Sequence, residues 1–133
     1  MNSVFKLKVR SYELDSFGHV NNAVYLRYAE EAKWDFLSEL SLLGALEEKG
    51  LFPVILESNI RYMHELRRND LVRIETVWST KGKILNFEHM MYNESDNDTR
   101  ACRIKGKMIF ADSSRIIHDI PEELINYMEK QKN

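Results

Sequence analysis

The sequence predicts an α+β domain in which an antiparallel sheet curls around one long helix. Apolar residues recur at helical spacing after one alternating segment near the N-terminus, and the period then changes from 3.6 to 2 for most of the remaining chain. Short polar segments separate the later strands, which suits antiparallel hairpins because parallel crossovers need more chain. We therefore expect a five-stranded antiparallel sheet.

Length and composition limit the classes of protein to consider. The chain has 133 residues, 44% hydrophobic and 30% charged, which is typical of one globular domain spanning residues 1–133. Its 19 basic and 21 acidic residues create no overall positive field for nucleic acid or anionic lipid. One cysteine cannot form an intramolecular disulfide, and no apolar run approaches the roughly 18 residues of a membrane-spanning helix. We expect a soluble, cytoplasmic protein.

The N-terminal third predicts a strand, a loop and the long helix. Residues 4–12 alternate between apolar and charged side chains, as a half-buried strand requires. Asn21 or Asn22 is a good N-cap because its side-chain oxygen can accept a free backbone N–H of the first turn. The helix continues to Leu40. Its predicted buried residues are Tyr25, Leu26, Tyr28, Ala29, Ala32, Trp34, Phe36, Leu37 and Leu40.

The rest of the chain predicts one short helix, four strands and a final helix. The short helix covers residues 42–49 and stops at Gly50. Four successive strands suggest a meander, and Pro121 marks the start of the C-terminal helix. The four strands are expected at residues 54–66, 71–79, 84–93 and 100–112.

The loop before the long helix carries the most informative chemistry. The helix N-terminus presents unpaired N–H groups and partial positive charge, both suited to an oxyanion on a carbonyl oxygen. Asp15 lies just ahead of it and can face the same carbonyl, as general base toward water or as a nucleophile that gives a mixed anhydride. Gly18 allows close backbone approach to a ligand and a positive φ.

This loop resembles the signature of hotdog-fold acyl-CoA thioesterases of the 4-hydroxybenzoyl-CoA thioesterase type. The matching segment is Asp15-Ser16-Phe17-Gly18-His19-Val20-Asn21-Asn22, and the resemblance extends to Ile60-Arg61-Tyr62 and Asn69-Asp70-Leu71-Val72. It implies a hotdog fold, hydrolysis of acyl thioesters, Asp15 as catalytic carboxylate, and the Asn22 backbone N–H as the group that polarises the thioester carbonyl.

The sequence is also similar to plant-type acyl-acyl-carrier-protein thioesterases. That similarity adds His19 and Glu65 to the implied catalytic residues, although Phe17 stands where the plant-type enzymes have an asparagine. We expect Gly18, Tyr25 and Arg61 to bind substrate, either an acyl-CoA or an acyl-carrier-protein thioester. The resemblance further implies a homodimer, or a dimer of dimers, with sites at the subunit boundary.

Each residue also has a structural interpretation. Asp15 could cap a turn, His19 could pack at the helix start, Glu65 could be a strand-end charge, and Tyr25 is more often core. Cys102 is expected to be a small buried residue rather than a nucleophile.

Alternatives to hydrolysis are a non-catalytic acyl-CoA or lipid-binding hotdog protein and a hotdog dehydratase. Cofactor motifs do not appear in the sequence. His64-Glu65 lacks the second histidine of a zincin helix, and the sequence has no Gly-rich nucleotide motif and no Gly-x-Ser-x-Gly elbow. We expect no metal and no cofactor, with coenzyme A entering only as part of the substrate.

Overall fold

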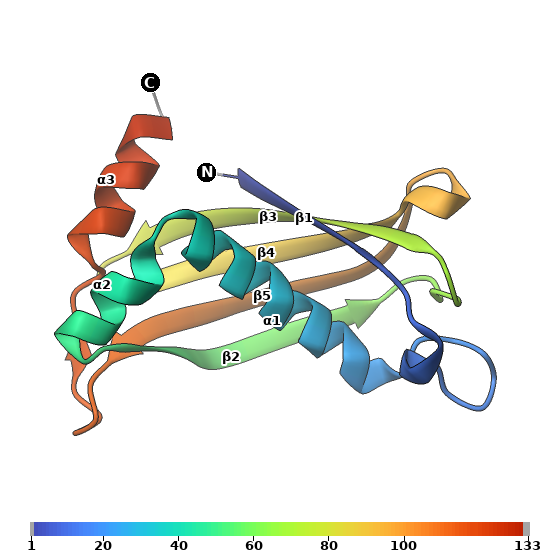
Figure 1. The fold of residues 1–133 in the computed structure, drawn as a ribbon, viewed down its shortest axis with the longest axis horizontal. Coiled ribbons are helices and arrows are strands. Elements are labelled where there is room, and N and C mark those ends of the chain that lie inside the picture. Colours follow the sequence, from blue (N-terminus) through green and yellow to red (C-terminus); the bar gives the residue numbers. More distant parts are fainter. Residues whose placement is uncertain (1, 132–133) are drawn as a thin grey trace.

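The computed structural model describes residues 2–131. One helix lies across one face of a sheet of long strands, and two shorter helices lie toward one end of that sheet (Figure 1). In chain order the elements are β1 (Asn2–Lys8), α1 (Asn22–Glu39), α2 (Leu42–Lys49), β2 (Phe52–Tyr62), β3 (Leu71–Lys81), β4 (Ile84–Asn93), β5 (Thr99–Ala111), β6 (Ile117–His118) and α3 (Glu122–Gln131).

The sheet has the order β1-β3-β4-β5-β2, and the short strand β6 also pairs with β5. All of these pairings are antiparallel. The predicted α+β class, with a sheet around one long helix, is confirmed. The five-strand prediction omitted β6, which extends over only two residues.

The predicted four-strand meander is wrong. Only β3, β4 and β5 follow one another as neighbours, because β1 pairs with β3 and occupies the position that β2 would need. The chain therefore crosses from β2 at one edge to β3 near the other, and β2 pairs with β5. The polar segment 67–70 belongs to this crossing and not to a hairpin.

Two predicted strands were too long at their C-terminal ends. β1 ends at Lys8, before a short 3-10 turn at Ser11–Glu13 in which the Arg10 N–H donates to Glu13 Oε1. β2 ends at Tyr62, because the next two N–H groups both donate to the Ala101 carbonyl and the chain turns away. The other strands, and the short helix that stops at Gly50, lie within two residues of their predicted bounds.

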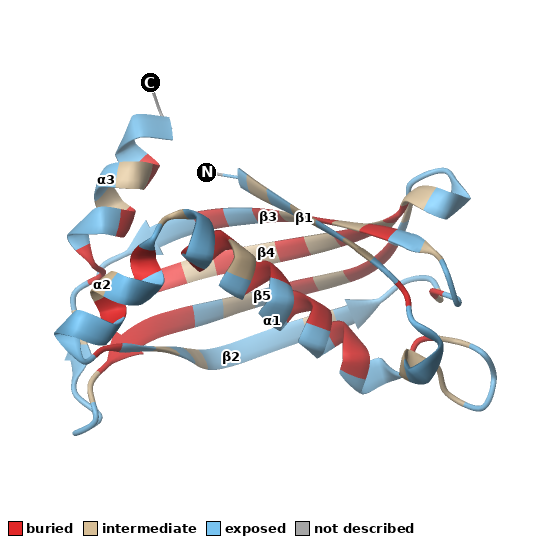
Figure 2. Ribbon diagram, in the orientation of Figure 1, coloured by how far each residue is buried: buried red, intermediate tan, exposed pale blue. Residues whose placement is uncertain are grey.

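Helix α1 begins as predicted, since Asn21 is its N-cap and Asn21 Oδ1 accepts the Ala23 N–H at 3.0 Å. Buried residues lie along α1 and the central strands, whereas most of β2 is exposed (Figure 2). The predicted burial of Leu26 and Trp34 is wrong: they are 42% and 39% exposed. Lys33, which the hydrophobic pattern did not select, is buried.

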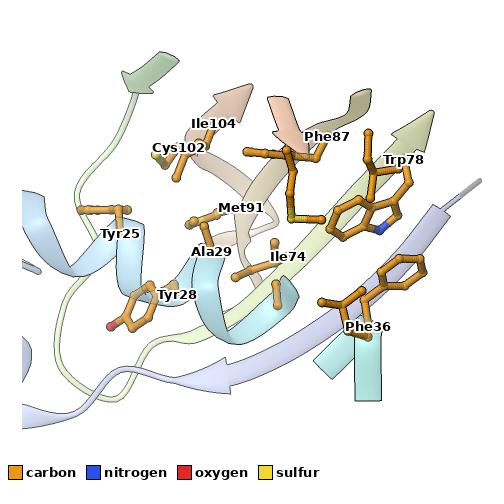
Figure 3. Packing of buried hydrophobic residues seen from close by; sticks show 14 of the residues in the cluster. Tyr25, Tyr28, Ala29, Phe36, Ile74, Trp78, Phe87, Met91, Cys102 and Ile104 are labelled. Carbon is orange, nitrogen blue, oxygen red and sulfur yellow. The ribbon is translucent and has the colours of Figure 1, made fainter. Parts of the chain in front are cut away.

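Aromatic side chains fill the core between α1 and the sheet. Trp78 stacks on Phe36 of α1 with ring centroids 4.4 Å apart and also contacts Phe87 of β4 (Figure 3). Gly106 allows this packing, because a Cβ there would lie 2.3 Å from Phe87 Cζ and 2.4 Å from the Glu57 carbonyl oxygen. Within residues 2–131, no helix is long and apolar enough to cross a membrane.

Candidate active site

The loop between the first strand and α1 closes as a tight chain reversal. The Asp15 N–H donates to the His19 carbonyl at 2.7 Å, and the Gly18 N–H donates to the Asp15 carbonyl at 3.1 Å. Gly18 has φ +80°, which confirms the positive φ expected for it. A bridge between Leu14 and Val20 closes the base of this loop, so that the residue before Asp15 pairs with a residue two positions before the start of α1.

The Asp15 carboxylate has one anchored and one free oxygen. Its Oδ1 accepts the N–H groups of Phe17, at 2.9 Å, and of His19, at 3.1 Å. These two hydrogen bonds are the ones expected if Asp15 caps a turn, as its structural interpretation proposed. Its Oδ2 has no hydrogen-bond partner among the described residues. The loop therefore fixes the carboxylate and leaves one oxygen available.

The first turn of α1 is held from two sides. The Val20 N–H donates to the Leu66 carbonyl at 2.8 Å, and the Tyr62 hydroxyl donates to the Asn22 carbonyl at 3.0 Å. Asn21 accepts the Ala23 N–H through Oδ1 and the Val24 N–H through its carbonyl. The Asn22 N–H has no acceptor in the part of the chain that the structure describes. It is therefore available to a ligand oxygen, as the partial positive charge at a helix start favours.

The segment after β2 lies beside this loop. His19 forms an antiparallel bridge with Arg67, which places Glu65 two residues from the bridge. Arg67 Nη2 donates to Glu65 Oε1 at 3.3 Å. The backbone N–H of Glu65 and the Arg67 guanidinium hold the pKa of the Glu65 carboxyl below its usual range. The structure thus brings Asp15, His19, Asn22 and Glu65 to one end of α1.

The remaining predicted residues differ in their surroundings. Tyr25 is buried, its ring packs edge-on against Tyr62 at 5.3 Å, and burial raises its pKa to about 12. Arg61 is exposed on β2 opposite Arg103 of β5. Cys102 is buried, as expected, and burial raises the pKa of its thiol to about 12, which disfavours the thiolate.

Sequence reasoning missed the hydroxyl groups of two tyrosines that hold the site. The Tyr28 hydroxyl donates to Glu13 Oε1 at 2.8 Å and joins α1 to the turn before Asp15. The Tyr62 hydroxyl joins β2 to the helix start. Tyr28 lies at helical spacing and was predicted to be buried, and Tyr62 lies in a predicted strand. The signal that could have identified these contacts was the hydroxyl group, because a buried tyrosine hydroxyl usually has a hydrogen-bond partner.

A cavity of about 350 Å³ lies between α1 and the sheet, further along the helix. Its wall is mainly apolar, with four polar residues from α1, β2 and β4: Glu30, Lys33, Ser58 and His89. None of the predicted site residues lines it. Its wall comes from five elements, so no single stretch of sequence indicates it.

A family profile described as the thioesterase-like superfamily matches residues 9–127. The chain belongs to this superfamily. Thioester hydrolysis is the general activity that the match supports, and the resemblance to hotdog-fold thioesterases is confirmed.

Two curated relatives of this thioesterase-like chain carry related names. One is the chloroplastic acyl-acyl carrier protein thioesterase ATL3 of Arabidopsis thaliana, 27% identical over 131 residues, which are 94% of this chain and 68% of the relative. The other is the long-chain acyl-CoA thioesterase FadM of Escherichia coli, 38% identical over 69 residues, which are 52% of each chain.

Solved structures of thioesterases have the same fold. The probable thioesterase YbaW of Escherichia coli superposes with a TM-score of 0.78 at 26% identity, over 86% of this chain and 87% of the other. A putative thioesterase from Pseudomonas aeruginosa superposes with a TM-score of 0.84 at 24% identity, over 94% and 96% of the two chains. The second similarity concerns the fold alone. Together these structures assign the hotdog fold to this thioesterase-like chain.

Proposed function

We propose that this chain hydrolyses acyl thioesters of coenzyme A or of an acyl carrier protein at the Asp15 loop, releasing a free acid and a thiol. The proposal depends on one observation: a carboxylate oxygen and a helix-start N–H, Asp15 Oδ2 and Asn22 N–H, both without partners among the described residues, lie at the same end of α1. Membership of the thioesterase-like superfamily supports it.

In this mechanism the Asn22 N–H donates to the thioester carbonyl oxygen. Asp15 removes a proton from water, and the water oxygen attacks the carbonyl carbon. The negative charge that develops on the carbonyl oxygen is stabilised by the N–H and by the partial charge of the helix. When the tetrahedral intermediate collapses, the carbon–sulfur bond breaks and the thiolate leaves. In the alternative route, Asp15 attacks the carbonyl carbon itself, the carbon–sulfur bond breaks as the thiolate leaves, and water then hydrolyses the resulting mixed anhydride to the free acid and the Asp15 carboxylate.

His19 and Glu65 have supporting roles in this proposal. The His19 backbone holds Asp15 through two hydrogen bonds, one in each direction, so its position defines the carboxylate's position. Glu65 is paired with Arg67, which favours its ionised form. We propose that these two residues order polar groups around the attacking water.

Gly18 and Arg61 are proposed to contact the substrate. A Cβ at Gly18 would meet nothing within 4 Å, so this side of the loop is open to a ligand. Arg61 is an exposed cation suited to a phosphate of coenzyme A. Tyr25 is buried against Tyr62, which favours a role in holding the helix start over direct contact with substrate.

We propose that two copies pair through β2. This strand is at an edge of the sheet and exposes Phe52, Val54 and Leu56. An exposed apolar edge strand is a template for pairing with another chain. Size-exclusion chromatography with light scattering should give twice or four times the mass of one chain. A mass of one chain at micromolar concentration contradicts this assembly.

The test of the function is a panel of acyl-CoA and acyl-carrier-protein thioesters assayed for release of free thiol. The Asp15→Asn variant should lose about 10²- to 10⁴-fold in kcat. An asparagine oxygen can still accept the Phe17 and His19 N–H groups, so the loop should keep its structure. Asp112→Asn is the matched control, because Asp112 Oδ1 also accepts two backbone N–H groups, from Ser114 and Ile116.

The control variant should retain the wild-type rate. Equal rates for the wild type and Asp15→Asn would exclude Asp15 as the base or nucleophile. Saturable binding of acyl-CoA with no turnover of any thioester would instead support the non-catalytic alternative.

A further inference from the structure

The cavity between α1 and the sheet contains a buried histidine with one ring nitrogen unpaired. His89 of β4 is 2% exposed, and its Nδ1 lies 2.7 Å from Thr76 Oγ1. Its Nε2 has no hydrogen-bond partner within residues 2–131. Every fully enclosed side-chain nitrogen or oxygen of these residues has a partner, so the unpaired Nε2 is not fully enclosed. Because His89 lines the cavity, its Nε2 opens onto the cavity.

The surroundings of His89 favour a neutral ring. It packs edge-on against Trp78 at 5.9 Å and beside Phe87 at 5.0 Å, and burial lowers its pKa to about 4. Thr76 can donate to Nδ1 or accept from it, so Nε2 can serve as either a donor or an acceptor. A neutral imidazole of this kind suits a hydroxyl or oxo oxygen and attracts a carboxylate only weakly.

A second polar group lies at the same wall. Lys33 is 5% exposed, and its Nζ lies 2.9 Å from Glu30 Oε1. Glu30 neutralises the charge of the Lys33 ammonium, so the pair adds no net charge to the cavity wall. Apart from these groups and Ser58, the cavity is apolar, with Leu26, Ile55, Trp78 and Ile104 among its lining residues. Such a space suits a hydrocarbon chain that carries one neutral oxygen.

The position of the cavity along α1 sets where that oxygen would be. Leu26 is one helical turn after Asn22, and Glu30 is two turns after it. At 1.5 Å per residue, Glu30 lies roughly 12 Å along the helix from Asn22. The charges of Glu30 and Lys33 both act on the His89 ring, which places His89 at this part of the cavity. The thioester carbonyl of the proposed function lies at the helix start. An oxygen beside the carbonyl would not reach His89, whereas one near the far end of a medium-length chain would.

We propose that this cavity binds the acyl chain of the substrate and that His89 Nε2 hydrogen-bonds a hydroxyl or oxo oxygen at the distal end of that chain. This inference rests on the proposed function, since it takes the helix start as the position of the thioester. It makes His89 a residue that determines specificity and assigns it no part in the reaction.

The test compares kcat/KM for ω-hydroxydecanoyl-CoA, β-hydroxydecanoyl-CoA and decanoyl-CoA. The wild type should prefer the ω-hydroxy substrate about three- to tenfold over the other two, as expected for one hydrogen bond. A variant with His89→Phe and Thr76→Val removes both buried partners together. It should lose this preference, so that its own kcat/KM values for ω-hydroxydecanoyl-CoA and decanoyl-CoA agree within about twofold. Equal values for the three substrates with wild-type protein overturn the proposal, whether or not the variant folds.

Binding of the free acids separates this inference from the proposed function. By isothermal titration calorimetry, wild-type protein should bind ω-hydroxydecanoic acid about three- to tenfold more tightly than decanoic acid. If no thioester is hydrolysed but this difference is present, the proposed function fails and the cavity assignment stands. If thioesters are hydrolysed but the two acids bind equally, the cavity assignment fails and the function stands.

Discussion

Two loops of this protein, residues 15–19 and residues 112–116, have the same backbone structure. In each, the first residue is an aspartate whose Oδ1 accepts the backbone N–H groups two and four residues later. In each, the N–H of the aspartate donates to the carbonyl of the fifth residue, and the fourth residue has a positive φ, +80° at Gly18 and +66° at Arg115. This turn is a general way to reverse a chain and by itself implies no chemistry.

The two loops differ at the second carboxylate oxygen and in the element that comes next along the chain. Asp112 Oδ2 lies 2.8 Å from His118 Nε2, and the next element is a two-residue strand. Asp15 Oδ2 has no partner in the described chain, and the next element is the longest helix. The free oxygen and the neighbouring helix start, and not the turn, therefore favour Asp15 as the reactive carboxylate.

Replacing each aspartate with alanine should reveal the largest difference between the two loops, which is a difference in kcat. Asp15→Ala and Asp112→Ala each leave two backbone N–H groups without their acceptor, so both should lower the free energy of unfolding by about 1–2 kcal/mol. Only Asp15→Ala should also lower kcat, by about 10²- to 10⁴-fold. Urea unfolding and thiol release measure the two quantities separately. A comparable loss of activity in both variants would mean that the loops act through stability alone.

The backbone structure of the first loop could be predicted from sequence because its residues are consecutive. Residues 15–22 contain the carboxylate, a glycine at positive φ and the N-cap, and each residue's place in the turn follows from local backbone rules. The similarity of the two loops was not predictable, since Asp-Ser-Phe-Gly-His and Asp-Ser-Ser-Arg-Ile share only their first two residues. Backbone geometry, and not side-chain identity, makes them alike.

Features assembled from distant segments could not be predicted. Alternation identified β2 as a strand, but its place beside β5 depends on β1 pairing with β3, which periodicity does not encode. The cavity likewise needs α1 and four strands together, so His89 and Lys33 were not singled out. Leu26 lines this cavity and is still partly exposed, which explains why its apolar character wrongly predicted full burial.

A smaller effect should separate the fourth residues of the two loops. Gly18→Ala places a Cβ at φ +80° and should destabilise the protein by about 1–2 kcal/mol. Arg115→Gly relieves the same strain at φ +66° and should stabilise it by up to about 1 kcal/mol, because glycine also loses more chain entropy on folding. Thermal unfolding of the two variants measures these opposite changes. Shifts of the same sign would contradict the proposed equivalence of the two positions.

The weakest of these differences is an acid sensitivity specific to the second loop. The hydrogen bond from His118, together with backbone N–H groups of the loop, holds the pKa of the Asp112 carboxyl below its usual value. The folded protein therefore stays deprotonated at Asp112 to lower pH than the unfolded chain does. This stabilisation is fully present above the pKa of the unfolded chain, about 3.9, and is lost as the pH falls through the lower folded value.

Asp112→Asn should therefore flatten the loss of stability as the pH falls below about 3.9, relative to wild type, in urea unfolding. Glu94 and Glu123 also have lowered pKa values, so part of the acid sensitivity must remain in the variant. His118→Ala removes the hydrogen bond that contributes most to the lowered pKa of Asp112. It should flatten the pH profile of stability less than Asp112→Asn does, because the Ser114 and Ile116 N–H groups still favour the ionised carboxylate. An unchanged profile in both variants would show that the Asp112 and His118 pair does not link this loop to pH.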